Sequence, residues 1–411
     1  MHHLSGLIGL AAIFLFAWAI STDRRRIRYS IVLRAFLLQF SIAIFVLYVP
    51  VGREMIAGLS SGVVSILDYA RVGINMVFGG AVANLPSISF AFQVLPIIVF
   101  FSSLMAVLYH LKIMQKVVRL IGGALQRIIG TAPVESLNAA TTILVGQSEA
   151  PLVIKPYIPG LTAPQLFAVM VSGFASVAGT LLAAYAQMGI RLDYLLAASF
   201  MAAPGGLLMA KIIMPDAPED VGNGATSADL RAIDRMPSEH VNVIMAAAAG
   251  AQDGVKVAVN VAAMLLAFVA LIAMVNGIIG GIGGWFGYPS LSMQLILGTI
   301  FAPVMYLLDI PWSEARVAGG LFGEKLILNE FIAYFHLGQV AGELSARTQA
   351  IVTFSLCGFA NFASIAIQMG CLGILAPSRR AEVARFGLRG VAAGSLSNLM
   401  SAAMAGIILN F

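Results

Sequence analysis

Apolar segments of about 20 residues recur along the whole chain, and they constrain its fold more than any other feature, because a helix of that length can cross about 30 Å of hydrocarbon. Of the 411 residues, 60% are hydrophobic and only 10% are charged, which is too apolar for the surface of a soluble protein of this size. We therefore expect an all-α polytopic membrane protein with eight transmembrane helices, over residues 4–20, 31–50, 91–110, 166–190, 192–213, 257–279, 351–375 and 391–411.

The basic residues follow the positive-inside rule. Arginines at 24–26 and 28 come after the first apolar segment, whereas a cleavable signal peptide would carry its charge before it. We expect this segment to be retained, with the N-terminus outside and the basic clusters facing the cytoplasm. Only isolated arginines then remain outside, at positions 53, 191, 316 and 347. This distribution explains the net charge of +5 without a nucleic-acid partner.

Five segments between these spans have a different pattern. Residues 58–84 and 113–129 mix charged and apolar residues, which indicates amphipathic interfacial helices, and residues 291–308 could form a short span or a surface helix. Residues 134–159 and 312–337 are interrupted near the middle by glycine and polar groups. Each predicts a re-entrant hairpin, because non-helical backbone at membrane depth must be packed in protein or face water.

The two halves of the chain have the same order of segments. Gly-Phe-Ala-Ser-Val-Ala-Gly at 173–179 resembles Gly-Phe-Ala-Asn-Phe-Ala-Ser at 358–364, and each motif follows a predicted hairpin. With alternating topology the halves become inverted repeats, as in many secondary transporters. The alternative is chance recurrence of a small-residue packing motif. The expected units are N-terminal membrane helices with an interfacial helix (1–90), a first repeat (91–213), a cytoplasmic connector (214–256) and a second repeat (257–411).

Each hairpin carries a carboxylate at its interruption. Gln147, Ser148 and Glu149 stand together in the first, and Asn329 and Glu330 in the second. Ionisable groups inside a membrane are costly and usually line a substrate or ion path. This set suits a solute rich in hydroxyls and amide-like edges better than an anion. The alternative is that each glutamate only pairs with a lysine of its own hairpin: Lys155 in the first and Lys325 in the second.

Other functional classes have less support. The chain contains no H-E-x-x-H, G-x-S-x-G or G-x-x-x-x-G-K-[ST] motif, so we expect neither an enzyme nor a bound cofactor. The longest polar loop, 215–239, is too short for the nucleotide-binding domain of a primary pump. A channel would explain polar groups at depth, but paired hairpins with sugar-like hydrogen-bonding groups fit a solute carrier better. Cys357 and Cys371 have no metal-ligand spacing and are expected to be small core residues.

Four stretches resemble the concentrative nucleoside transporters: QSEAPLVIKPY at 147–157, AASFMAAP at 197–204, LNEFIAY at 328–334 and LCGFANF at 356–362. They occur in order over nearly the whole chain. The resemblance implies a secondary active symporter that takes up nucleosides, driven by a cation gradient. It also implies a homotrimer in which a mobile transport domain moves like an elevator against a scaffold. The short, compact chain favours a bacterial inner membrane, with lipid around the protein.

The same resemblance implies roles for individual residues. The first hairpin would contact the nucleobase through Gln147, Ser148 and Glu149. The ribose hydroxyls would contact Glu330 of the second hairpin and Asn361 and Ser364 of the span after it. Two apolar side chains, Phe359 and Leu181, would flank sugar and base. A carboxylate that accepts from two vicinal hydroxyls makes charge-assisted hydrogen bonds. The sequence does not decide whether the substrates are purine or pyrimidine nucleosides.

The sequence allows either sodium or a proton as the coupling ion. The ligands of the sodium-coupled members correspond here to Thr142, Val145, Ser176 and Val177. Position 142 departs from the asparagine expected there, and a threonine hydroxyl is a shorter and weaker acceptor. A proton could instead be carried by Glu149 or Glu330. Sodium is slightly favoured, and the alternatives are a proton-coupled carrier of another small polyhydroxylated or nucleobase-like solute, or a channel.

Overall fold

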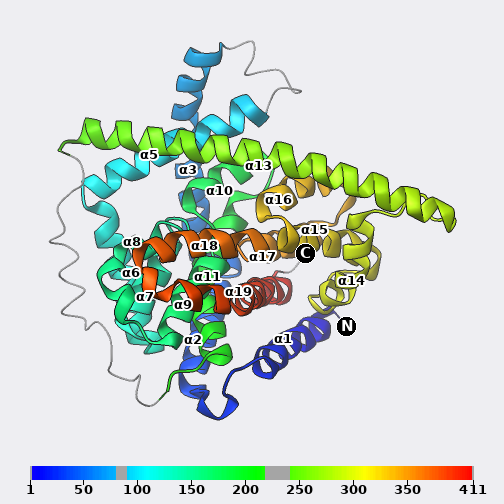
Figure 1. Cartoon of the computed structure of the whole chain (residues 1–411), viewed down its shortest axis with the longest axis horizontal. Helices are drawn as coiled ribbons and strands as arrows, with labels where there is room; N and C mark the ends of the chain where they lie inside the picture. The colour runs from blue at the N-terminus through cyan, green and yellow to red at the C-terminus, as the bar shows by residue number, and fades with distance from the viewer. Residues whose placement is uncertain (1, 80–89, 218–240, 410–411) are drawn as a thin grey trace.

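The computed structural model describes residues 2–79, 90–217 and 241–409, and within these ranges it consists of helices joined by short connections (Figure 1). The N-terminal unit contains α1 (His2–Ala19), α2 (Tyr29–Leu47) and α3 (Pro50–Phe78). The first two helices match predicted spans. α3 begins eight residues before the predicted amphipathic segment 58–84, and residues 80–84 of that segment lie outside the described ranges.

The corner between α2 and α3 is tight. Pro50 occupies the first turn of α3, where its missing N–H costs no hydrogen bond. Gly52 packs directly on the last turn of α2, since a Cβ at this position would lie 1.8 Å from the carbonyl oxygen of Phe45. A side chain here would force the two helices apart.

Within the described ranges, the two repeats have the same order of seven α-helices (Figure 1). The first contains α5 (Leu95–His110), α6 (Ile113–Ile129), α7 (Pro133–Thr142), α8 (Ala150–Val153), α9 (Ala163–Ala175), α10 (Gly179–Gln187) and α11 (Leu192–Ile213). The second contains α13 (Val243–Trp285), α14 (Met293–Leu307), α15 (Trp312–Ile327), α16 (Glu330–Val340), α17 (Ala346–Leu356), α18 (Phe362–Leu375) and α19 (Arg380–Ile408). Short 3-10 turns lie at Arg24–Arg26, Lys155–Gly160, Ala341–Glu343 and Pro377–Arg379, and a π turn lies at Phe90–Val94.

The two predicted hairpins are interrupted helix pairs. α7 and α8 are separated by residues 143–149, and α15 and α16 by Leu328 and Asn329. Both interruptions coincide with the polar groups seen in the sequence. The direction from which each hairpin enters the membrane, and hence the inverted relation of the halves, stays a prediction.

Two of the predicted spans are not continuous helices, which corrects the sequence-based assignment. Residues 166–190 contain a break at 176–178 between α9 and α10, and residues 351–375 contain a break at 357–361 between α17 and α18. The breaks lie side by side, because the N–H of Phe359 donates to the carbonyl of Ser176 at 3.0 Å. The Gly-Phe-Ala motifs that suggested a repeat therefore mark the breaks.

The helix that opens the second repeat is also longer than predicted. α13 has 43 residues, about 65 Å at about 1.5 Å per residue. The predicted span covered only 257–279, and residues 243–256 were predicted to belong to the connector. This extra part packs on α5: a Cβ at Gly250 would lie 2.5 Å from the Cβ of Ala106, and one at Gly254 would lie 2.6 Å from the Cα of Val99. The spacing Gly-x-x-x-Gly permits this close approach of two helices.

The C-terminal helix begins earlier as well. The predicted span was 391–411, and α19 starts at Arg380, so its first turns carry the basic residues that were expected to precede it. Residues 410 and 411 lie outside the described ranges. α11 and α6 have the predicted bounds.

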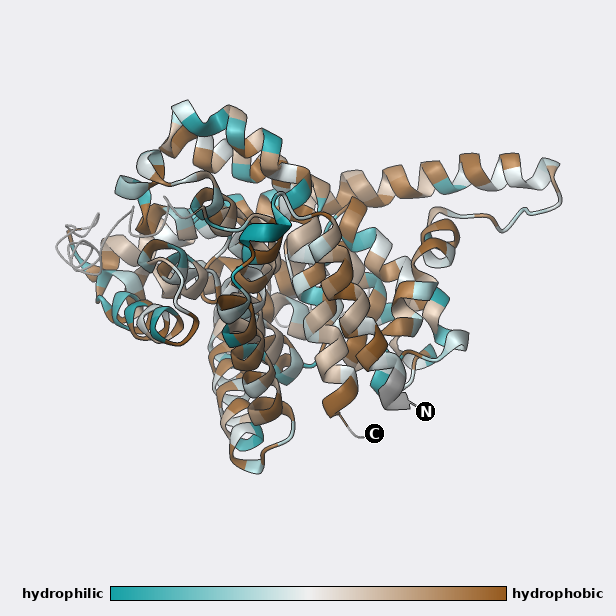
Figure 2. Cartoon of the chain, turned by 90° about the horizontal axis from the view of Figure 1, so that it is seen from below, coloured by the Kyte–Doolittle hydropathy of each residue, from teal (hydrophilic) through white to brown (hydrophobic). Residues whose placement is uncertain are grey.

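Central and peripheral helices are clearly distinguished. Buried residues make up 89% of the most apolar window of both α9–α10 and α11 and 83% of that of α19, but only 11% of that of α13. α13 crosses one face of the body and projects beyond it, with hydrophobic residues along most of its length (Figures 1 and 2). In the described ranges, six helical segments could cross a membrane by length and composition, or up to eight if each of two bent helix pairs is one span. The exact count of eight stays a prediction.

Candidate functional site

The interrupted helices meet around a cavity of about 200 Å³. Residues from both hairpins and both broken helices line it, together with a wall from α5 and α13. All eight residues predicted to contact substrate are in its lining: Gln147, Ser148, Glu149, Leu181, Glu330, Phe359, Asn361 and Ser364. The sequence-based choice of residues thus corresponds to one place in the structure, while the role of each stays a prediction.

Three helices of the core begin at this cavity. In each case the residue just before the helix lines the cavity: Ala178 before α10, Asn329 before α16 and Asn361 before α18. The two asparagines cap their helices: Oδ1 of Asn329 accepts from the N–H of Ile332 at 2.9 Å, and Oδ1 of Asn361 accepts from the N–H of Ser364 at 2.8 Å. Helix N-termini carry a partial positive charge, so they favour a carboxylate or a polar solute at this point.

Glu330 is held by two donors from the broken helices. The hydroxyl of Tyr185 on α10 donates to its Oε1 at 3.0 Å, and Nδ2 of Asn361 donates to its Oε2 at 3.3 Å. Both Glu330 and Tyr185 are buried. A carboxylate with one donor on each oxygen has a defined orientation and retains further lone pairs that can accept from a solute.

Gln147 joins the first hairpin to α18. Its Nε2 donates to the hydroxyl of Ser364 at 2.8 Å, and its Oε1 accepts from Nε2 of Gln368 at 3.2 Å. Gln368 also donates to the carbonyl of Met170 at 2.9 Å. Gly173 makes room for this network, because a Cβ there would lie 2.7 Å from Nε2 of Gln368. Gln147, in the first repeat, is therefore oriented by two partners on α18, in the second repeat.

The other predicted substrate residues form the rim and the apolar wall. Ser148 and Glu149 are exposed, and the carbonyl of Ser148 accepts from Sγ of Cys371 at 2.8 Å. Phe359 is half-buried, and Leu181 is buried. The cavity thus combines a few polar groups with apolar surface, which is usual for small-molecule sites.

The four candidate cation ligands come from two segments that pack together. The N–H of Gly179 donates to the carbonyl of Leu144 at 3.2 Å. Each of the two hydroxyl groups donates to a carbonyl of its own helix, Thr142 to Ala139 at 2.9 Å and Ser176 to Ser172 at 2.9 Å. Their oxygens keep lone pairs for a hard cation. The other two candidates, Val145 and Val177, are close to them in the sequence and are also buried. They would contribute backbone carbonyls.

The alternative in which lysines hold the hairpins by ion pairs is wrong. Among the described residues, neither Glu149 and Lys155 nor Glu330 and Lys325 come within ion-pair distance. Lys155 is exposed. The buried amine of Lys325 donates instead to Oδ1 of Asn398 at 2.7 Å and to the carbonyl of Ser355 at 3.3 Å.

Asn398 connects both helix breaks, and sequence reasoning missed it. Its Nδ2 donates to the carbonyls of Ala175 at 2.7 Å and Cys357 at 2.8 Å, which are the last residue of α9 and the residue after α17. These carbonyls lack helical partners because the helices stop there. Sequence reasoning also missed Tyr185 and Gln368. Each is a polar residue in a largely apolar helix, and the local sequence does not show which carboxylate or amide it contacts.

A cavity lined by interrupted helices of two repeats, with polar groups among its walls, is typical of a secondary transporter. The chain belongs to the concentrative, or Na+-dependent, nucleoside transporter family. Three family models cover most of it: the N-terminal part of the Na+-dependent nucleoside transporters matches residues 8–81, a nucleoside recognition model matches 91–191, and the C-terminal part matches 194–406.

Individual relatives agree with this assignment. An uncharacterised transporter of Bacillus subtilis, YutK, is 49% identical, with all of both chains covered. The nucleoside permease NupC of Helicobacter pylori is 46% identical over 99% of this chain and 98% of the relative. The structure of CNTnw in an inward-facing, substrate-bound state superposes with a TM-score of 0.94 at 49% identity, over 99% of this chain and 98% of that one. The protein is an integral membrane transporter and not an enzyme.

Proposed function

We propose that this protein is a sodium-coupled symporter that takes up nucleosides across a bacterial inner membrane. The observation that carries the proposal is the position of Glu330, which lines the cavity and whose carboxylate is oriented by Tyr185 and Asn361. A fixed, desolvated carboxylate accepts strongly from vicinal hydroxyls and discriminates against a solute that lacks them.

The two hairpins have separate roles in this proposal. Glu330, Asn361 and Ser364 bind the ribose, and Gln147, Ser148 and Glu149 bind the base, with Phe359 and Leu181 packing beside sugar and base. Support comes from the lining of one cavity by all eight residues. Changes at Glu149 should alter which nucleosides are taken up, whereas changes at Glu330 should remove recognition of all of them.

Uptake of labelled uridine and adenosine by Glu330→Ala tests the ribose role. We expect uptake to fall to background, with the protein folded by size-exclusion profile. The matched control is Glu343→Ala, which removes an exposed glutamate in the 3-10 turn after the same hairpin and should retain uptake. Robust uptake by Glu330→Ala would refute the assignment. Failure of both nucleosides to be taken up by the unmodified protein, with uptake of another polyhydroxylated solute, would favour the alternative substrate class.

Sodium enters through the oxygens around Thr142 and Ser176 and travels with the substrate. The description of the family as Na+-dependent supports this ion. Replacing sodium by choline at constant pH should abolish uptake, whereas a proton-coupled carrier would continue. Thr142→Ala should raise the sodium concentration needed for half-maximal uptake. Thr299→Ala is a matched control, because its hydroxyl makes the same kind of intrahelical bond, to Leu295 at 2.8 Å, on the exposed face of α14.

We further propose a homotrimer with its N-terminus outside, in which the hairpins and broken helices move as an elevator against a scaffold that includes α5 and α13. The support is the extensive packing of α5 on α13 and the largely exposed apolar surface of α13, which would contact lipid and neighbouring subunits. The mass of the detergent-solubilised protein by light scattering should correspond to three chains. A mass of one chain would contradict this part.

A further inference from the structure

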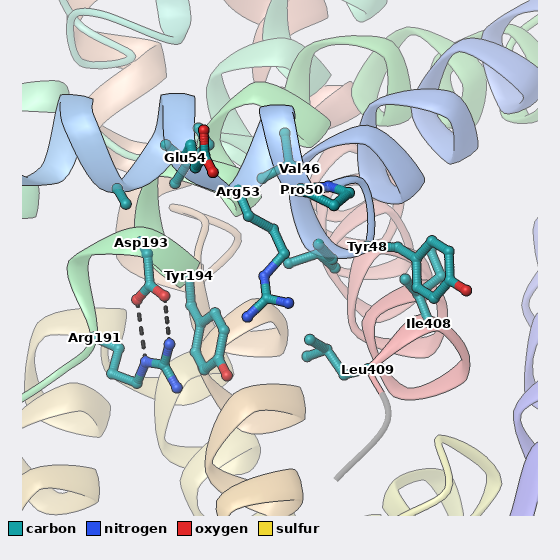
Figure 3. A pocket seen from close by; sticks show the side chains of 13 residues that line it. Val46, Tyr48, Pro50, Arg53, Glu54, Arg191, Asp193, Tyr194, Ile408 and Leu409 are labelled. Atoms are coloured by element: carbon teal, nitrogen blue, oxygen red, sulfur yellow. Dashed lines mark hydrogen bonds and ion pairs between the residues drawn. The ribbon is translucent and has the colours of Figure 1, made fainter.

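A second cavity lies at the ends of several helices, and none of the predicted substrate residues lines it. Figure 3 shows the side chains that line it. It has a volume of about 840 Å³ and is open to the surroundings. Its walls come from the end of α2, the first turns of α3, the start of α11 and the end of α19. α2, α3, α11 and α19 are candidate membrane spans by length and composition. The ends of such spans lie where hydrocarbon gives way to lipid headgroups. In the predicted topology this is the outer face.

One guanidinium in this cavity has no carboxylate partner. Arg53, in the first turn of α3, points into the space between Tyr194 and Leu409 (Figure 3). Among the described residues, Arg53 makes no ion pair. The other arginine, Arg191, is occupied: it pairs with Asp193 through two nitrogens, and its guanidinium lies 4.0 Å from the ring centroid of Tyr194.

The remaining lining limits which ligand fits. Two arginines are balanced by two carboxylates, Glu54 and Asp193, so the cavity has no net charge and does not favour a highly charged anion. Glu54 is exposed and makes no ion pair among the described residues. The side formed by Ile408 and Leu409 is apolar. A ligand with a phosphate, an amino group and hydrocarbon chains would satisfy all three features.

We propose that this cavity binds a zwitterionic phospholipid whose headgroup carries a primary amine, of the phosphatidylethanolamine type. Arg53 binds the phosphate, because a guanidinium matches two phosphate oxygens at once. Glu54 accepts from the ammonium group, and the acyl chains leave along Ile408 and Leu409. The bound lipid links α3 to the start of α11 and the end of α19, which no described ion pair joins at this cavity.

The test measures binding of short-chain lipids to the purified full-length protein by native mass spectrometry and thermal unfolding. The probes are dihexanoyl phosphatidylethanolamine, phosphatidylcholine, phosphatidylglycerol and inorganic phosphate. We expect the ethanolamine lipid to bind best and Arg53→Gln to weaken it about tenfold or more, the usual effect of losing a charged hydrogen-bond donor. Glu54→Gln should remove the preference over phosphatidylcholine.

Arg28→Gln is the matched control, because Arg28 is an exposed arginine at the opposite end of α2 and does not line the cavity. It should bind the ethanolamine lipid like the unmodified protein. Equal binding by Arg53→Gln, tighter binding of phosphatidylglycerol, or an equal effect of inorganic phosphate would each overturn the proposal. Neither arginine is part of the predicted substrate site, so these results are independent of nucleoside uptake.

Discussion

Removal of the Tyr185 hydroxyl provides a sharp test of how the site is organised. In Tyr185→Phe, Oε1 of Glu330 loses the donor that lies 3.0 Å away, while the packing of the ring on Tyr334, with centroids 4.6 Å apart, can be retained. A hydrogen bond to a charged group contributes about 1.5–3 kcal/mol, and each 1.4 kcal/mol corresponds to about a factor of ten in affinity. We expect the lower end of this range, because Asn361 still donates to the other oxygen.

The assay is initial-rate uptake of labelled uridine, normalised to transporter content. KM should rise about tenfold, while the maximal rate changes less, since Tyr185 orients Glu330 and is a positioning residue. The matched control is Tyr334→Phe. This tyrosine is equally buried and neighbours Tyr185, but its hydroxyl donates to the carbonyl of Thr353 at 2.8 Å. It should lower thermal stability and leave KM unchanged. An unchanged KM in Tyr185→Phe, or equal KM changes in both variants, would refute the reasoning.

Two further substitutions test the framework of the site. Asn398→Ala leaves the buried amine of Lys325 without its side-chain partner and the carbonyls of Ala175 and Cys357 without their donor. We expect the free energy of unfolding to fall by about 3 kcal/mol or more, seen as a lower melting temperature in detergent. An unchanged melting temperature would contradict the role of Asn398. Gly173→Ala places a Cβ 3.0 Å from the Cβ of Gln147 and should reduce uptake strongly, whereas Gly123→Ala, with open space around the new Cβ, should not. Equal uptake by both glycine variants would show that Gln147 tolerates displacement.

Local sequence patterns were sufficient for the elements whose ends are marked by turn chemistry or charge. α6 ends at a glycine in the left-handed conformation, Gly130 with φ of 85°, and its predicted bounds were correct. The hairpin interruptions were found because Glu149 and Glu330 are conspicuous in apolar surroundings. The helix breaks at 176–178 and 357–361 were missed because these segments are nearly as apolar as their neighbours, and hydropathy does not show whether a backbone hydrogen bond is made.

The length of α13 was missed for a related reason. Residues 243–256 contain Gly250, Asp253 and Gly254, which locally favour a connector. The helix continues through them because both glycines face α5 and allow it to approach closely, while Asp253 stays exposed and pairs with Lys256 at 2.7 Å. A glycine pair lowers helix propensity in isolation but favours helix packing when a partner is present.

The amino-acid sequence by itself determined that this chain is a helical membrane protein with two related halves, because hydrophobic length and isolated polar groups are local properties. Which eight residues should surround the substrate came from the resemblance of its motifs to the concentrative nucleoside transporters. Only the tertiary structure decided how those groups are oriented and where the helices stop. Glu330 depends on Tyr185, which is 145 residues away in the chain. The break at Ala175 depends on Asn398, at a separation of 223 residues. Buried polar groups must find partners, and for these two the partner comes from the opposite repeat.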